Sequence, residues 1–127
     1  MDVSGARTPW HLWAVGLFVL VLYGWAAGWG LWFLLTGALS EVIEIFWLTG
    51  LWAAALGSIA LLLRRKEARL LFVAVVVAAV VSAISVLVGA SGGMWLPVVV
   101  VNCVTHLFGG GLLLLYARAM ARRGVLR

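Results

Sequence analysis

Residues 70–88 read LLFVAVVVAAVVSAISVLV, an apolar stretch that follows the charged run RRKEAR at residues 64–69. In water, the valine-rich part from Val73 to Val81 would suggest a buried strand. The stretch is, however, near the length of about 20 residues that a helix needs to cross about 30 Å of hydrocarbon. Its length and its lack of polar breaks therefore predict a transmembrane helix.

Three more stretches of this kind occupy most of the remaining chain, at residues 10–35, 42–63 and 95–116. They are continuous rather than alternating, which favours helices over the strands of a membrane barrel. So little chain separates them that neighbouring helices must pack antiparallel. We predict an all-α integral membrane protein: a single domain over residues 1–127, built as an antiparallel four-helix bundle with helices at 10–35, 42–63, 70–88 and 95–116.

The composition supports a membrane protein and excludes several functional classes. Of the 127 residues, 66% are hydrophobic and 10% are charged, against about 45–50% and about 25% in a soluble domain. The lone Cys103 excludes a disulfide framework and thiolate metal sites within one chain. The few acidic residues, Asp2, Glu41, Glu44 and Glu67, argue against two-carboxylate hydrolysis. We predict no catalytic site, no metal site and no enzymatic activity.

The basic residues predict the orientation of the chain. They lie in the loop at 64–69, in the tail from Arg118 to Arg127 and at Arg7, whereas the other two loops contain no Lys or Arg. Because cytoplasmic loops are rich in Lys and Arg, we expect the N and C termini and the middle loop to be cytoplasmic. The net charge of +5 therefore reflects membrane orientation, and nucleic acid is not an expected partner.

Small residues recur at four-residue spacing and so line single helix faces. Such faces let transmembrane helices approach one another closely. They serve either packing inside the bundle or a seam for another subunit, and both uses rely on the same contacts. The residues are Gly24 and Gly28; Gly50, Ala54 and Ser58; Ala74, Ala78 and Ser82; and Gly109, Gly110 and Gly111.

His106 is the most informative polar residue within the apolar stretches. It lies about 16 Å beyond Trp95 along a helix axis, which places it near the bilayer midplane, and Asn102 precedes it by about one turn. An ionisable group at this depth is a functional candidate, because its burial is costly without a partner. One interpretation is that His106 and Asn102 bind a cofactor, haem or quinone, or that His106 ligates a metal or relays protons. The other is a neutral histidine that bonds to Asn102, to a serine or to a backbone carbonyl.

His11, the other histidine, stands among tryptophans at the predicted cytoplasmic start of the first helix, where it suits the membrane interface. Its depth differs from that of His106 by about 15 Å, so the two imidazoles cannot easily clamp one haem within a monomer. A haem that bridges two copies through their His106 side chains is left as an alternative.

Glu41 and Glu44 open the second apolar stretch on the predicted outer side. Ser40 is a candidate N-cap, and carboxylates suit the positive end of a helix dipole. The alternative interpretation is an entry site for a cation or a proton.

Several short stretches in the first half of the chain resemble a known group of proteins. They are TPWHLW at residues 8–13, and FWLTGLW at 46–52 followed by LGS at 56–58 and LLLRR at 61–65. They resemble small, uncharacterised, four-span proteobacterial inner-membrane proteins. The resemblance covers the first two helices, the stretch from Thr36 to Glu44 is shorter than in those proteins, and His106 has no counterpart in them. It implies location in a bacterial inner (plasma) membrane and no particular chemistry.

These features predict a small polytopic membrane protein that acts as an accessory or assembly subunit. Its partners would be the lipid bilayer and either another membrane protein or further copies in a homo-oligomer, met through helix–helix contacts. Two alternatives remain: a redox protein that binds haem or quinone at His106, and a small oligomeric transporter or channel. No cofactor is needed for the first of these functions.

Overall fold

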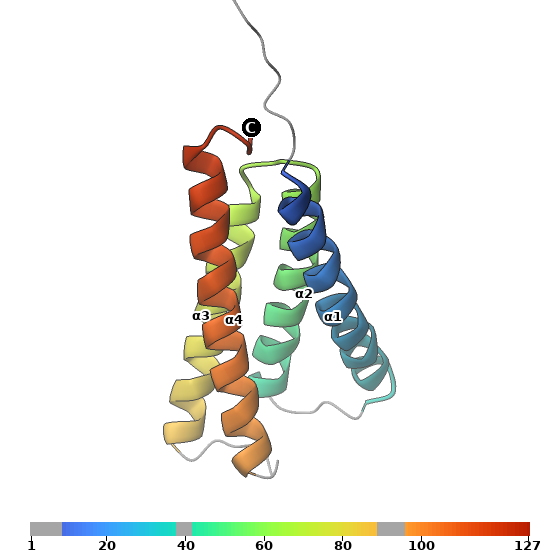
Figure 1. The fold of residues 1–127 in the computed structure, drawn as a ribbon. Coiled ribbons are helices and arrows are strands. Elements are labelled where there is room, and N and C mark those ends of the chain that lie inside the picture. Colours follow the sequence, from blue (N-terminus) through green and yellow to red (C-terminus); the bar gives the residue numbers. More distant parts are fainter. Residues whose placement is uncertain (1–8, 38–41, 89–95) are drawn as a thin grey trace, which may run out of the picture.

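The computed structural model contains four α-helices within the described residues, which are 9–37, 42–88 and 96–127 (Figure 1). In chain order they are α1 (Trp10–Leu35), α2 (Val42–Leu62), α3 (Ala68–Leu87) and α4 (Leu96–Arg122). All four are long and apolar enough to cross a membrane, and no strand occurs in these ranges. The predicted all-α, four-helix membrane bundle is confirmed.

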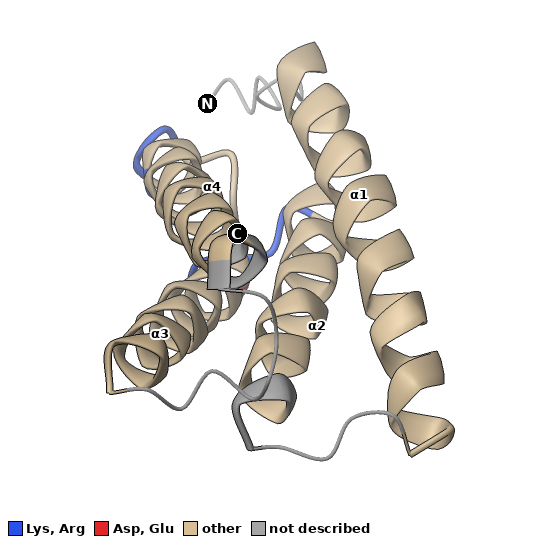
Figure 2. Ribbon diagram, turned by 90° about the horizontal axis from the view of Figure 1, so that it is seen from below, with Lys and Arg blue, Asp and Glu red and all other residues tan. Residues whose placement is uncertain are grey.

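The helices pack in chain order, each antiparallel to the next (Figure 1, Figure 2). Among the described residues, Cα atoms come within 8 Å of each other between α1 and α2, α2 and α3, and α3 and α4, and at a few places between α2 and α4. The Cα atoms of α1 and α4 do not approach this closely in the same ranges. α1 therefore packs its backbone against α2 alone and lies at the edge of the bundle.

The centre of the bundle is the contact between α2 and α3. Leu51 and Ala54 of α2 are almost fully buried, as is Phe72 of α3. Gly57 lets the two helices come close, because a Cβ atom at this position would lie 2.9 Å from the Phe72 ring. Apolar side chains gain little by leaving lipid, so close packing of this kind is what holds such helices together.

α4 continues to Arg122 and so corrects the predicted end at Tyr116. The apolar run stops at the first arginine, but the following residues, ARAMAR at 117–122, are all good helix formers. Gly124, two residues beyond the end of α4, has φ +70° and terminates the helix. There Val125 N–H donates to the Met120 carbonyl and Gly124 N–H to the Ala121 carbonyl, both at 3.0 Å, which is a Schellman motif. α3 likewise begins at Ala68 instead of Leu70, because a charged residue ends an apolar run without ending a helix.

The chain end folds back onto the loop between α2 and α3. Arg127 N–H donates to the Arg64 carbonyl at 2.7 Å, and Lys66 N–H donates to the Arg127 carbonyl at 3.0 Å. Arg64 Nε–H donates to the Val125 carbonyl at 3.0 Å, while the Val125 and Leu126 side chains are buried. This contact closes the basic end of the bundle, defined as the end that carries every described Lys and Arg (blue in Figure 2).

Candidate functional site

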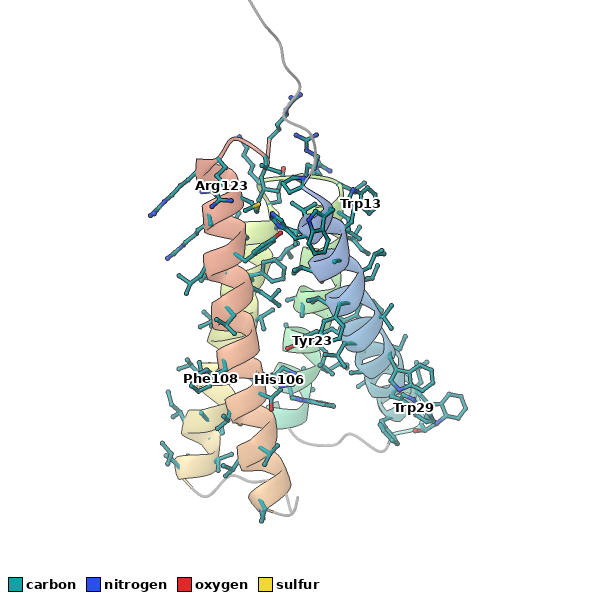
Figure 3. All side chains as sticks on the ribbon, viewed as in Figure 1. Trp13, Tyr23, Trp29, His106, Phe108 and Arg123 are labelled. Carbon is teal, nitrogen blue, oxygen red and sulfur yellow. The ribbon has the colours of Figure 1, made fainter. Side chains whose placement is uncertain are left out.

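Two side chains join α1 to α4 inside the bundle. Tyr23 of α1 and His106 of α4 point towards each other (Figure 3), with ring centroids 5.6 Å apart and ring planes at 85°. Trp47 of α2 also packs against His106, with ring centroids 6.4 Å apart. Gly109 makes room for the tyrosine, since a Cβ atom there would lie 2.9 Å from Tyr23 Oη. Edge-to-face contacts like these are one of the two favoured arrangements of aromatic rings.

A small cavity adjoins His106. It is bounded by His106, Trp47, Ser82 and Cys103 and by apolar residues of α2 and α3, and its volume is about 10 Å³. That is space for about one water molecule. A haem or quinone ring does not fit there, and His106, only 9% exposed, faces the interior of its own bundle rather than a second copy. Asn102 lies in α4, but its side chain falls outside the described residues, so the predicted pairing with His106 stays a prediction.

A second histidine–tyrosine pair joins the same two helices near the basic end. His11 Nδ1 of α1 and the Tyr116 hydroxyl of α4 are hydrogen-bonded at 2.6 Å. The ring centroids are 5.9 Å apart and the planes are nearly perpendicular. The two histidines therefore contact different tyrosines at different levels of the bundle, and each connects α1 to α4 where the backbones stay apart.

The two faces of α1 differ in kind. The buried face is a single stripe at helical spacing, formed by Leu12, Gly16, Val19, Tyr23, Ala27 and Gly30. Gly24 and Gly28 lie on the outer side. Among the described residues, and leaving out the neighbouring backbone of α1 itself, no heavy atom lies within 4 Å of a Cβ atom added at either glycine. The glycine pair singled out in the sequence therefore packs against nothing within the described chain.

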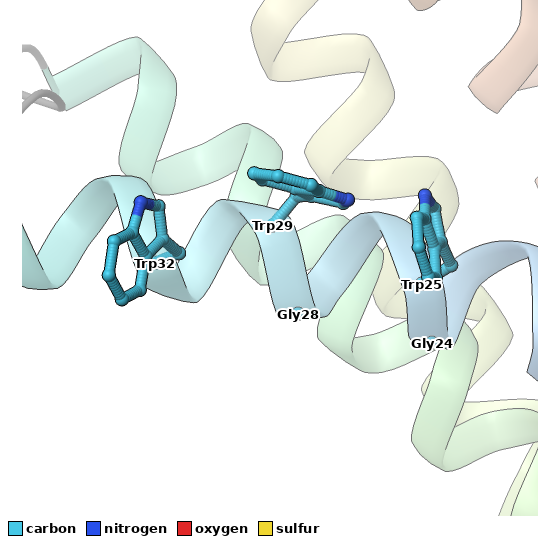
Figure 4. Close-up of a pocket in the computed structure, with 5 residues that line it drawn as sticks. All are labelled: Gly24, Trp25, Gly28, Trp29 and Trp32. Carbon is cyan, nitrogen blue, oxygen red and sulfur yellow. The ribbon is translucent and has the colours of Figure 1, made fainter.

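Tryptophans stand beside this open glycine pair. Trp25, Trp29 and Trp32 line an open groove of about 410 Å³ together with Gly24 and Gly28 (Figure 4). The rings of Trp25 and Trp29 pack against each other, with their centroids 6.2 Å apart. Trp25 is 71% exposed although it lies well inside the span. We call these five residues the α1 outer face.

The other small residues that the sequence singled out pack inside the bundle, except Gly111. A Cβ atom added at Gly50 would lie 3.2 Å from the Ala78 Cβ, and one added at Gly110 would lie 2.9 Å from Val75 Cγ1. Gly111 is open in the same sense as Gly24 and Gly28. Buried positions on α2 and α3 include Ala54, Ser58, Ala78 and Ser82, while Ala74 is half-buried and packs against the core. Packing inside the bundle thus accounts for the small residues of α2 and α3 and for Gly109 and Gly110, whereas Gly24, Gly28 and Gly111 are open to a partner outside the described chain.

Three further glycines, which were not predicted from the sequence, are needed for the helix packing. Gly16 and Gly30 of α1 face Leu62 and Leu48 of α2, and Gly57 faces Phe72. Gly30 follows Ala26, and Gly57 follows Ala53, at the same four-residue spacing that identified the other small residues, so that signal was present. Gly16 has leucines on both sides at that spacing and gives no such signal. Ser40 and Glu41 fall outside the described residues, as does the Glu44 side chain.

Comparisons of the chain with protein-family models, with curated proteins and with solved structures each find no match.

Proposed function

We propose that this protein is a small accessory subunit of a membrane assembly, and that it associates with a second copy of itself through the α1 outer face. The observation that carries the proposal is the open position of Gly24 and Gly28 beside three tryptophans. Glycine destabilises a helix by about 0.5–1 kcal/mol relative to alanine. At Gly24 and Gly28 no close helix contact within the described chain offsets this cost. In a membrane, a glycine pair at this spacing lets the backbone of a second helix approach closely.

A second copy matches this face because it supplies the same residues at the same depth. The basic end sets the orientation of every copy alike, so two α1 helices in one membrane run parallel. A two-fold axis between them places Gly24 and Gly28 of one copy opposite those of its partner. Trp25, Trp29 and Trp32 then add large apolar rings beside the glycine contact, where they support close packing.

The same proposal places the protein in a bacterial inner membrane with its basic end in the cytoplasm. The described Lys and Arg residues all lie at the end of the bundle where α1 begins and α4 ends. The preference of basic residues for the cytoplasm supports a cytoplasmic basic end. The resemblance of the first two helices to proteobacterial inner-membrane proteins supports a bacterial inner membrane as the site of assembly.

The proposal is tested by co-expressing two copies that carry different affinity tags and purifying them through one tag. We expect the second tag to co-purify with the wild type and to be lost from the Gly24→Leu/Gly28→Leu variant. Gly111→Leu is the matched control, because Gly111 is also an open glycine but lies on α4. None of these substitutions meets an atom inside the described chain at Cβ, so the fold should survive them.

Two results would contradict the proposal. If the double variant still brings down the second tag as the wild type does, the α1 outer face is not the interface. If the wild type brings down no second tag but instead another polypeptide that the double variant loses, the partner is a different protein.

A redox or transport function at His106 has less support in the geometry. The adjoining cavity has space for about one water molecule. Aromatic rings of α1 and α2 pack against the imidazole. A Soret band in the purified protein that disappears in His106→Ala would instead support a haem site at His106.

A further inference from the structure

A groove opens between α3 and α4 at the basic end of the bundle. Its volume is about 460 Å³, and we call it the α3–α4 groove. The lining comes from the loop before α3 with Lys66 and Glu67, from the start of α3 with Arg69, Leu70 and Val73, and from the last turns of α4 with Leu114 and Arg118.

The lining changes from charged to apolar along the axis of the bundle. α3 runs away from the basic end, so Val73 lies one turn deeper than Arg69. α4 runs towards the basic end, so Leu114 lies one turn deeper than Arg118. One turn is about 5.4 Å. The groove therefore has a cationic mouth at the end of the bundle and an apolar floor next to it, and the Leu70 side chain in its lining is exposed.

The cations at the mouth are available to a ligand. Lys66, Arg69 and Arg118 are exposed, and their side chains make no hydrogen bond or ion pair within the part of the chain that the structure describes. Glu67 is the one acidic residue in the lining, and its carboxylate already pairs with Arg65 at 3.5 Å. The mouth thus carries an excess of positive charge.

We infer that the α3–α4 groove binds an anionic phospholipid. The guanidinium groups of Arg69 and Arg118 suit a phosphate, which they can bind through two parallel hydrogen bonds. Basic pockets between transmembrane helices at the cytoplasmic side are a recurring form of site for anionic lipid head groups. The apolar floor of Leu70, Val73 and Leu114 lies where the acyl chains of such a lipid begin, and a soluble anion would make no use of it.

The test is native mass spectrometry of the purified protein in detergent, titrated with phosphatidylglycerol or with phosphatidylcholine. We expect phosphatidylglycerol adducts on the wild type at concentrations where phosphatidylcholine gives few. In Arg69→Gln/Arg118→Gln the apparent affinity for phosphatidylglycerol should fall at least about tenfold, because both charge-assisted contacts of the groove with the phosphate are lost. Arg122→Gln/Arg123→Gln removes the same charge from the same end but outside the groove, and it should bind as the wild type does.

A second pair of substitutions separates phosphate binding from charge alone. Arg69→Lys/Arg118→Lys keeps both positive charges but loses the two parallel hydrogen bonds, so its affinity should lie between those of the wild type and the glutamine variant. Equal losses in the groove variant and in the Arg122/Arg123 control would show that total charge, not the groove, attracts the lipid. Equal binding of the two lipids to the wild type would equally overturn the inference. Circular dichroism of every variant checks that the helices are intact.

Discussion

Arg64 shows how one residue connects the loop between α2 and α3 to the end of the chain. It has φ +60°, in the left-handed region that usually takes glycine. It stands just after α2, where Arg64 N–H donates to the Leu61 carbonyl and Arg65 N–H to the Ala60 carbonyl, so α2 ends in a Schellman motif with arginine in the glycine position. Its carbonyl and its Nε–H both bond to the end of the chain, at Arg127 and Val125. These bonds explain why arginine occupies a strained position.

Substitutions at Arg64 separate backbone strain from side-chain bonding. Arg64→Ala loses the bond to Val125 and keeps the strain, so we expect it to destabilise the protein by about 1–2 kcal/mol. Arg64→Gly loses the same bond but relieves the strain, so it should be more stable than the alanine variant by about 1 kcal/mol. Thermal unfolding in detergent measures the difference. An alanine variant as stable as the glycine variant would contradict a left-handed backbone at this position.

At the scale of single helices, the apolar runs predicted the existence of all four elements and the class of the fold. Hydropathy failed at the end of α4 and at the start of α3, because it registers the first charge while helix propensity and caps decide the boundary. It also did not distinguish glycines that pack inside the bundle from glycines that lie open. Gly24 and Gly57 look alike in sequence, and only the position of the neighbouring helix separates them.

The two kinds of helical glycine should respond oppositely to a methyl group. Gly57→Ala places a Cβ atom 2.9 Å from the buried Phe72 ring. We expect overpacking to destabilise the bundle by about 1–3 kcal/mol, which outweighs the better helix propensity of alanine. Gly111→Ala meets open space and should leave stability unchanged or raise it by up to about 1 kcal/mol. Unfolding in a denaturing detergent compares them, and equal stabilities would mean that α2 and α3 are not in close contact at Gly57.

At the scale of the whole molecule, the candidate site was less predictable than the fold. The sequence identified His106 but not Tyr23 or Trp47, because an aromatic residue in an apolar run carries no sign of the direction it faces. It also did not show that α1 and α4 are joined by two histidine–tyrosine pairs while their backbones remain apart. Among the described residues, that arrangement leaves the α1 backbone close to α2 alone and the outer face of α1 open, which is the basis of the proposed association.

Cysteine cross-linking in native membranes tests that association most directly. In a Cys103→Ser background, Val21→Cys places a thiol on the exposed side of α1, one turn before Gly24. Val77→Cys places one at an exposed position on α3 as the matched control. The proposed dimer predicts that mild oxidation converts the Val21→Cys protein to a covalent dimer and leaves the Val77→Cys protein monomeric. Cross-linking that is absent from Val21→Cys, or equally strong from both positions, would contradict association through the α1 outer face.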